Sequence, residues 1–259
     1  MEIGWISPIK FDQHTVGKFY ELEGILMNIA LIIAGGSGHR MQQEIPKQFL
    51  NVNDKPIIVY TLEVFQSHPD VDEIGVVCIE GWHDILRAYA RQYKIDKLTW
   101  IVPGGKNGQD SIRNGVFEAE SRYKPEDILL IHDAIRPLVS HEIISDCIVQ
   151  CRQYGSAITV TPCNTAVLRK TTQTASEEVV PRDQLAMTQT PQAFPIGKLA
   201  DIHRKALERG ITNSVANCTL MIEMGQEVHF SVGAETNIKL TTPDDLKIFK
   251  ALLSLGGRE

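Results

Sequence analysis

Cations and glycines gather near the start of the chain in IIAGGSGHRMQQEIPKQFL, residues 32–50. The residues of this stretch that could do chemistry are Gly35, Gly36, Gly38, Arg40 and Lys47. Glycine lets the backbone bend sharply and bring its N–H groups close to an anion, and the N-terminus of a following helix adds positive potential. The pattern favours a phosphate-binding loop, although the glycines alone also suit an ordinary strand-to-helix turn.

Two common nucleotide-binding patterns do not fit this loop. The Rossmann fingerprint requires G-x-G-x-x-G and an acidic residue about 20 positions later, and AGGSGHR does not supply it. The P-loop requires Ser or Thr after its lysine, and neither follows Lys47. What remains is a glycine loop with Arg40 just behind it and Lys47 further on, where either cation alone is weak evidence because exposed Arg and Lys are common.

Two further stretches place polar residues directly after an apolar run. LLIHDAIRP, residues 129–137, leads into Asp133 and Arg136, and VPGGKNGQDSIRNG leads into Ser111. In open parallel sheets, ligands bind beyond the carboxyl ends of the strands. Asp133 could therefore hold a metal or a hydroxyl and Arg136 a phosphate; the alternative is a helix-capping Asp beside a surface Arg.

The positioning elements alternate between strand-like and helix-like segments. The expected strands are Asn28–Ile33, Glu73–Ile79, Leu98–Val102, Asp127–His132, Ser156–Thr161 and Glu227–Val232. The expected helices are Pro56–Gln66, Trp82–Gln92, Asp110–Ser121, His141–Gln153, Ile196–Glu208, Ser214–Met224 and one starting at Pro243 with Thr242 as its cap. This alternation predicts an α/β fold with three layers (α/β/α), in which helices cover both faces of a mostly parallel sheet.

The segment from Pro162 to Gln192 interrupts the alternation, because it is polar and β-prone with no helical period. We interpret it as a β-hairpin arm that leaves the main body, and the alternative is a mobile surface loop.

Composition points to a soluble protein of the cytoplasm. No apolar run reaches the roughly 18 residues of a membrane span, and the net charge of −6 argues against a nucleic-acid-binding surface. The five cysteines contain no CxxC pair, which fits reduced thiols in the cytoplasm.

The order of motifs resembles the cytidylyltransferases that act on alditol phosphates. These motifs are AGGxGxRM, PKQFL, GGx(5)SIxNG, HDAxRP, TPQxF and NIKxTxPxDL. The family includes enzymes for methylerythritol 4-phosphate in isoprenoid synthesis and for ribitol 5-phosphate in cell-surface polymer synthesis. The resemblance covers about residues 28–254, so we expect a Rossmann-like nucleotidyltransferase domain at 27–259, with the arm at about 162–192, and an N-terminal extension at 1–26.

The resemblance implies a role for each matching residue. Nucleotide contacts are implied for Ala34, Gly35, Gly36, Gly38, Gly105, Ser111 and Ala134. Contacts to the acceptor are implied for Asp133, Arg136, Thr165, Arg182, Thr190 and Lys239, with Asp133 also close to Mg²⁺. The residues implied in catalysis are Arg40, Lys47, Arg182 and Lys239. Arg182 matches an arginine that reaches the neighbouring subunit's site, so a homodimer joined by the arm is implied.

The identity of the acceptor is the open question. Gly108 stands where many members carry arginine, and Thr212–Ser214 replaces an acidic T-D motif. The loop reads A-G-G, as in ribitol-type members, so we favour ribitol 5-phosphate and keep methylerythritol 4-phosphate as the alternative. A non-catalytic nucleotide-binding regulator and a sugar 1-phosphate nucleotidyltransferase also remain. Asn164 is a candidate partner for an acceptor hydroxyl, unless it only closes a turn.

Overall fold

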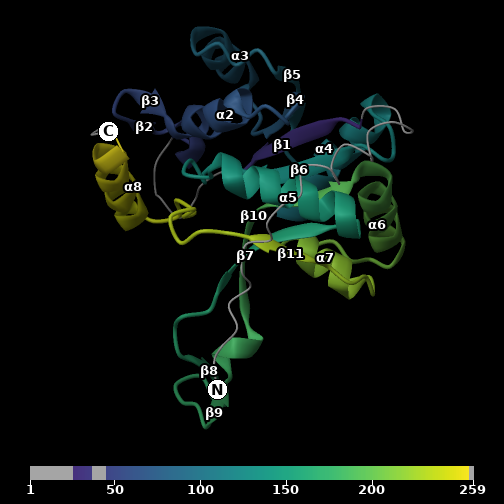
Figure 1. Cartoon of the computed structure of the whole chain (residues 1–259), viewed down its shortest axis with the longest axis vertical. Coiled ribbons are helices and arrows are strands. Elements are labelled where there is room, and N and C mark those ends of the chain that lie inside the picture. The colour runs from purple at the N-terminus through teal and green to yellow at the C-terminus, as the bar shows by residue number, and fades with distance from the viewer. Residues whose placement is uncertain (1–25, 37–44, 257–259) are drawn as a thin grey trace, which may run out of the picture.

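The computed structural model describes residues 26–36 and 45–256. At its centre lies a seven-stranded sheet in the order β11-β7-β10-β6-β1-β4-β5 (Figure 1). In that spatial order the strands span Phe230–Val232, Ala157–Pro162, Ala186–Pro195, Ile128–Asp133, Asn28–Ala34, Glu73–Cys78 and Leu98–Pro103. Only β10 runs antiparallel to its neighbours in this sheet, so the predicted mostly parallel sheet is confirmed.

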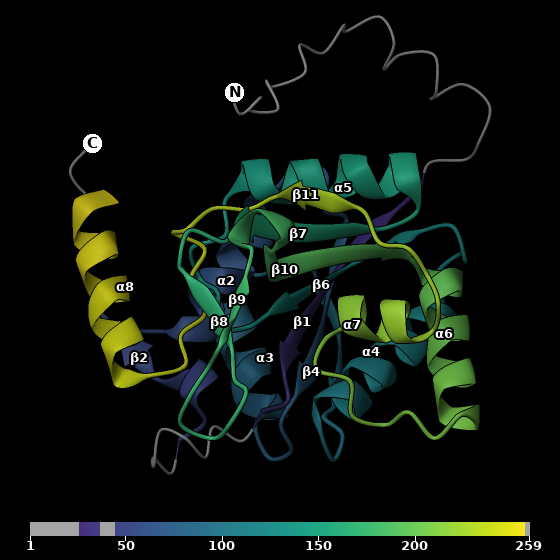
Figure 2. The same cartoon turned by 90° about the horizontal axis from the view of Figure 1, so that it is seen from below.

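Helices cover both faces of the sheet (Figure 2). One apolar core packs the sheet against α2 (Ile57–Ser67), α3 (His83–Gln92) and α5 (His141–Tyr154). The other packs it against α4 (Gly108–Arg122), α6 (Ile196–Glu208) and α7 (Asn217–Glu223). Alternate residues of β1 enter opposite cores, as the two-residue period of a strand requires: Ile29 and Leu31 face one, Ala30 and Ile32 the other. The predicted three-layer fold is confirmed.

The C-terminal helix α8 (Pro243–Gly256) closes a third, smaller core. Its Phe249 is fully buried and meets the ring of Tyr60 edge-on, with ring centroids 5.2 Å apart. The Thr242 hydroxyl accepts the Asp245 N–H at 3.2 Å, so Thr242 caps this helix as predicted. Beside this core lie the short β-hairpin β2 (Asn51–Val52) and β3 (Lys55–Pro56) and the 3-10 turn η2 (Lys47–Phe49).

A β-hairpin projects from the sheet, formed by β8 (Val167–Arg169) and β9 (Glu178–Val180) and followed by the 3-10 turn η3 (Arg182–Gln184) (Figure 1). The predicted arm is therefore present, but its predicted end at Gln192 is wrong. From Ala186 the chain is already strand β10, which pairs with both β6 and β7. Within the described residues no helix combines the length and apolar character that a membrane span requires.

Candidate functional site

Two glycine loops meet at the carboxyl edge of the sheet. Gly35 follows β1 and Gly104 follows β5. A Cβ added to Gly35 would lie 3.3 Å from the Gly104 Cα and 3.0 Å from the Ser111 Oγ, closer than side chains normally approach. The two loops can touch in this way because glycine stands at both contact points. Sequence reasoning predicted each loop, and the fold brings them together.

Gln48 holds the Gly35 loop through two hydrogen bonds of its side chain. Its side chain is buried, and its Nε2 donates to the carbonyls of Ala34 at 2.7 Å and Gly36 at 3.0 Å. The next residue, Phe49, stacks on Trp82 with ring centroids 4.5 Å apart, which fixes the η2 turn. Gln48 lies within the PKQFL motif, but nothing in the sequence alone indicates this role.

Ser111 organises the second loop. Its hydroxyl accepts the Gly105 N–H at 2.9 Å and donates to the Asn107 carbonyl at 2.9 Å. Ser111 is 4% exposed, and a Cβ on Gly105 would overlap the Asp110 backbone. The Ser111 proton and the Gly105 N–H are thus committed inside the protein, and the hydroxyl keeps one lone pair for a further donor.

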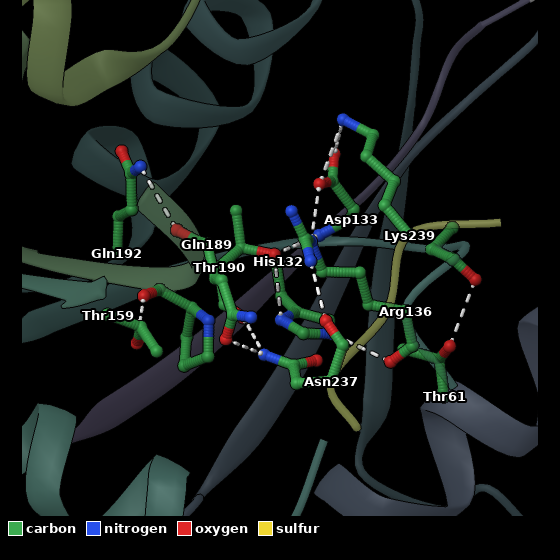
Figure 3. Close-up of polar contacts among 12 residues, drawn as sticks. Thr61, His132, Asp133, Arg136, Thr159, Gln189, Thr190, Gln192, Asn237 and Lys239 are labelled. Carbon is green, nitrogen blue, oxygen red and sulfur yellow. Dashed lines mark hydrogen bonds and ion pairs between the residues drawn. The ribbon is translucent and has the colours of Figure 1, made fainter. Parts of the chain in front are cut away.

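Three charged side chains meet where β6 ends (Figure 3). Lys239 Nζ lies 3.0 Å from both Asp133 carboxylate oxygens, and Arg136 Nε donates to Asp133 Oδ2 at 3.2 Å. Burial opposes the ionisation of Asp133, but Lys239 and Arg136 outweigh it and hold the pKa of the carboxyl below its usual value. Asp133 is therefore a carboxylate at neutral pH and keeps two cations together at the strand end.

His132 and Thr190 orient the backbone behind this cluster. Burial lowers the pKa of His132 to about 4, so the ring is neutral at pH 7. The Arg136 carbonyl can only accept, so His132 Nε2 carries the proton of their 3.2 Å bond. His132 Nδ1 then accepts from the Thr190 hydroxyl at 3.1 Å, and that hydroxyl accepts the Asp133 N–H. The Thr190 proton is consequently used within the protein.

Asn237 connects three segments of the site (Figure 3). It is fully buried, and its Nδ2 donates to Gln189 Oε1 at 3.0 Å and to the Thr190 carbonyl at 2.9 Å. Its backbone carbonyl accepts Arg136 Nη1 at 2.6 Å. Asn237 therefore ties the guanidinium to β10 and to the segment that carries Lys239. The sequence offered only its place in a motif as a signal.

A pocket of about 190 Å³ opens beside these residues. One side carries Asp133, Arg136 and Lys239, and the β10 residues reach it through Gln189 and Thr190. Thr188 and His132 also line it, and the other lining residues are apolar or amide: Ile33, Ile112, Ile131, Val215, Ala216, Asn217 and Gln192. A pocket that combines a cationic wall, formed by Asp133, Arg136 and Lys239, with apolar side chains suits a ligand that combines a phosphate with a carbon chain.

Other predicted site residues stand apart from this pocket or beyond the described chain. Gly38 and Arg40 lie outside the described residues. Lys47 begins the η2 turn and is half-buried. Ala134 is buried, with its N–H donated to the Ile33 carbonyl and its own carbonyl accepting from Thr61 at 2.9 Å.

Arg182 and Thr165 are exposed at the base of the arm, and neither lines the pocket. Arg182 Nη1 donates to the Asn164 carbonyl at 3.2 Å. The Asn164 side-chain amide donates to Glu235 Oε1 at 2.9 Å, so it joins the arm to the loop before Asn237. In this conformation Asn164 acts as a structural tie, and its amide is turned towards a carboxylate of the chain itself.

A protein-family model matches residues 28–255, and its description is IspD, 2-C-methyl-D-erythritol 4-phosphate cytidylyltransferase. The chain belongs to this family. The match agrees in extent with the motif resemblance and confirms the predicted family. The chain is therefore a CTP-using nucleotidyltransferase by family.

Individual members of the IspD family are similar over almost their full length. A ribitol-5-phosphate cytidylyltransferase of Lacticaseibacillus paracasei is 43% identical over 229 residues, covering 88% of this chain and 98% of the relative. One of Vibrio parahaemolyticus is 40% identical, covering 88% and 96%. A 2-C-methyl-D-erythritol 4-phosphate cytidylyltransferase of Clostridium botulinum is 37% identical, covering 87% and 97%.

Solved structures of the IspD family have the same fold. The 2-C-methyl-D-erythritol 4-phosphate cytidylyltransferase of Francisella tularensis superposes with a TM-score of 0.72 at 25% identity, covering 87% of this chain and 99% of that one. The enzyme of Thermus thermophilus gives a TM-score of 0.70 at 25% identity, covering 86% and 98%.

Proposed function

We propose that this chain transfers the cytidylyl group of CTP to ribitol 5-phosphate and releases pyrophosphate. The observation that carries the proposal is the meeting of the Gly35 and Gly104 loops beside the Asp133–Arg136–Lys239 cluster. A nucleotide held by the glycine loops would present its phosphates towards the cationic wall. Family membership and the named ribitol-5-phosphate relatives support the same reaction.

The proposed chemistry needs no strong general base. A phosphate monoester has a second pKa near 6 and is largely ionised at pH 7. One of its oxygens attacks the α-phosphorus of CTP, a P–O bond to that oxygen forms, and the bond to the bridging oxygen breaks as pyrophosphate leaves. The obstacle is the approach of two anions, which positioned cations overcome by stabilising charge on the equatorial oxygens.

Each cation has a proposed place in this reaction. Arg40 and Lys47 stabilise the α-phosphorus centre, while Lys239 and Arg136 hold the acceptor phosphate. The proposed nucleotide contacts come from Ala34, Gly35, Gly36, Gly38, Gly105, Ser111 and Ala134. The Thr190 hydroxyl already donates one hydrogen bond and accepts another within the protein, which supports a positioning role for that residue more than a direct acceptor contact.

Mg²⁺ is the proposed cofactor, with Asp133 as its protein ligand. Within residues 26–36 and 45–256 no group of three His, Cys, Asp or Glu side chains could hold a metal. Mg²⁺ does not require one, because it is commonly bound by one or two carboxylates with substrate phosphates and waters. Asp133, an ionised carboxylate lining the pocket, fits that donor set. Mg²⁺ would neutralise phosphate charge, and a chelator should abolish turnover until Mg²⁺ is restored.

A homodimer joined through the arm is also proposed. The arm exposes large apolar side chains: Leu168 is 61% exposed and Val179 76%. Leu168 and Val179 pair directly across the hairpin, so they lie on one face of it. Clustered exposed apolar residues mark interaction surfaces. A second copy is the proposed occupant, and Arg182 and Thr165 at the arm's base would reach the partner's acceptor site.

The acceptor is proposed from the named relatives. Two relatives identified as ribitol-5-phosphate cytidylyltransferases share 43% and 40% of their residues with this chain, and others of that name share 37–38%, against 37% for one named for methylerythritol 4-phosphate. Methylerythritol 4-phosphate remains the alternative acceptor. The regulator and the sugar 1-phosphate nucleotidyltransferase are the alternatives of other classes.

Pyrophosphate release separates these possibilities. The protein is incubated with Mg²⁺, each of CTP, UTP, ATP and GTP, and each of ribitol 5-phosphate, methylerythritol 4-phosphate and glucose 1-phosphate. Release with CTP and an alditol phosphate alone is the expected result. Release with glucose 1-phosphate would favour the sugar nucleotidyltransferase, and no release with any pair would favour the regulator.

A further inference from the structure

The loop at residues 211–216, between α6 and α7, forms one wall of the pocket. Val215 and Ala216 line it together with Ile112 of α4, and Asp133 and Lys239 line the same pocket. Val215 is 94% exposed, so nearly all of its side chain is open to solvent or to a ligand. The sequence predicts a helix from Ser214, but α7 begins at Asn217.

The bonds that hold this loop come from two amide side chains at the start of α4. Gln109 Nε2 donates to the Ile211 carbonyl at 2.9 Å, and Gln109 Oε1 accepts the Ser214 N–H at 2.7 Å. Asn107 Nδ2 donates to the Thr212 carbonyl at 3.1 Å. Gln109 is only 4% exposed, so its two bonds are sheltered from water. A buried amide that satisfies both a donor and an acceptor of one loop restrains that loop strongly.

The same two residues belong to the second glycine loop. Asn107 caps α4 by accepting the Asp110 N–H at 2.8 Å, and its carbonyl accepts the Ser111 hydroxyl. Ser111 in turn accepts the Gly105 N–H. A continuous chain of hydrogen bonds therefore runs from the proposed nucleotide loop through the start of α4 to the wall of the pocket.

We propose that Gln109 is a positioning residue for the acceptor. It fixes residues 211–216 so that Val215 packs against the carbon chain of the alditol while Lys239 and Arg136 hold its phosphate. This inference rests on the proposed function, because it assigns the pocket to the acceptor. An amide is required, since a carboxylate could accept the Ser214 N–H but would face the Ile211 carbonyl without a proton to donate.

The test compares Gln109→Ala and Gln109→Glu with the wild type and with Gln66→Ala. Gln66 is a matched control, because its Oε1 accepts the Lys97 N–H at 2.8 Å in a helix that does not meet the 211–216 loop. Both Gln109 variants should raise the KM for ribitol 5-phosphate about tenfold, the size expected for one or two lost hydrogen bonds. We expect kcat and the KM for CTP to stay within about threefold, and Gln66→Ala to leave all three unchanged.

Hydrogen exchange supplies a readout that does not depend on activity. The Ser214 amide should exchange faster in Gln109→Ala than in the wild type, because its acceptor is gone. Unchanged Ser214 exchange would show that Gln109 does not restrain residues 211–216. Faster exchange with an unchanged KM for ribitol 5-phosphate would show that this loop does not contact the acceptor. If the wild type shows no turnover, the proposed function fails by itself. Calorimetric binding of ribitol 5-phosphate then replaces KM, and equal affinities for wild type and Gln109→Ala would overturn the inference.

Discussion

At the scale of single residues, the site depends on one carboxylate that holds two cations. Asp133 accepts from Arg136 and Lys239, and Arg136 is held again by the Asn237 carbonyl. Lys239 keeps 42% of its side chain exposed, whereas Arg136 keeps 11%. Arg136 is therefore fixed before any substrate arrives, and Lys239 can exchange its carboxylate partner for a phosphate. Pre-positioned charge of this kind stabilises a transition state without reorganisation.

The role of Lys47 is the residue-scale prediction. If Lys47 stabilises charge at the α-phosphorus, Lys47→Ala should lower kcat by roughly two to three orders of magnitude, the range for loss of one positioned electrostatic donor. Steady-state kinetics with CTP measures this, and circular dichroism checks the fold. Lys205→Ala, on the exposed face of α6, is the control and should keep full activity. Activity of the Lys47 variant within a few-fold of wild type would remove it from the proposed chemistry.

Sequence reasoning found the charged residues of the site but not the amides that position them. Asp133 and Arg136 stand out because they follow an apolar strand, whereas Lys239 stands out only through its place in the NIKxTxPxDL motif, and the fold brings the three together. Gln48 binds the backbone carbonyls of Ala34 and Gly36, and Gln109 binds a backbone carbonyl and a backbone amide more than 100 residues further along the chain. A single sequence gives no sign of such partners, because any loop glutamine could equally face water.

At the scale of elements, α6 contains a buried histidine that makes the fold sensitive to acid. Burial lowers the pKa of His203 to about 4. The unfolded chain binds a proton at His203 near pH 6.5, but the folded chain does not until about pH 4. The contribution of the neutral, buried His203 to the free energy of unfolding is therefore full above about pH 6.5 and is lost as the pH falls to 4.

His203→Leu should reduce this loss. We compare the free energy of unfolding of the variant with that of the wild type at each pH. The variant-minus-wild-type difference should be roughly 2 kcal/mol more favourable to the variant at pH 5 than at pH 7.5. Urea unfolding at the two pH values measures it, and the pH 7.5 pair serves as the control for packing changes. An identical wild-type-minus-variant difference at both pH values would show that His203 is not protonated on unfolding.

The strands of the sheet differ in how visible they are in the sequence. β1, β4, β5, β6 and β7 were predicted to within about one residue, because buried parallel strands are continuous apolar runs. β10 was missed, since its first half reads AMTQT and is largely exposed where it leaves the sheet towards the arm. Its place between β6 and β7 is set by pairing with neighbours, which no local pattern reveals.

At the scale of the whole molecule, the arm predicts the oligomeric state. Sedimentation velocity at micromolar concentration should give a dimer for the wild type. The double variant Leu168→Asp, Val179→Asp should be monomeric, because paired charges on the exposed hairpin face repel across the interface and are costly to bury. Leu207→Asp, at a residue on α6 that is 43% exposed, is the control and should stay dimeric. A monomeric, fully active wild type would remove Arg182 and Thr165 from the proposed acceptor site.

The choice of acceptor tests the central claim most directly. Ribitol 5-phosphate and methylerythritol 4-phosphate share a phosphate and hydroxyls and differ in chain length and a methyl branch. A methyl group discriminates by only about 1–3 kcal/mol, whereas an unpaired hydroxyl partner costs a site more. The measurement is kcat/KM for each acceptor with CTP and Mg²⁺. We predict a preference above about tenfold for ribitol 5-phosphate, and a preference of that size for methylerythritol 4-phosphate would contradict the account.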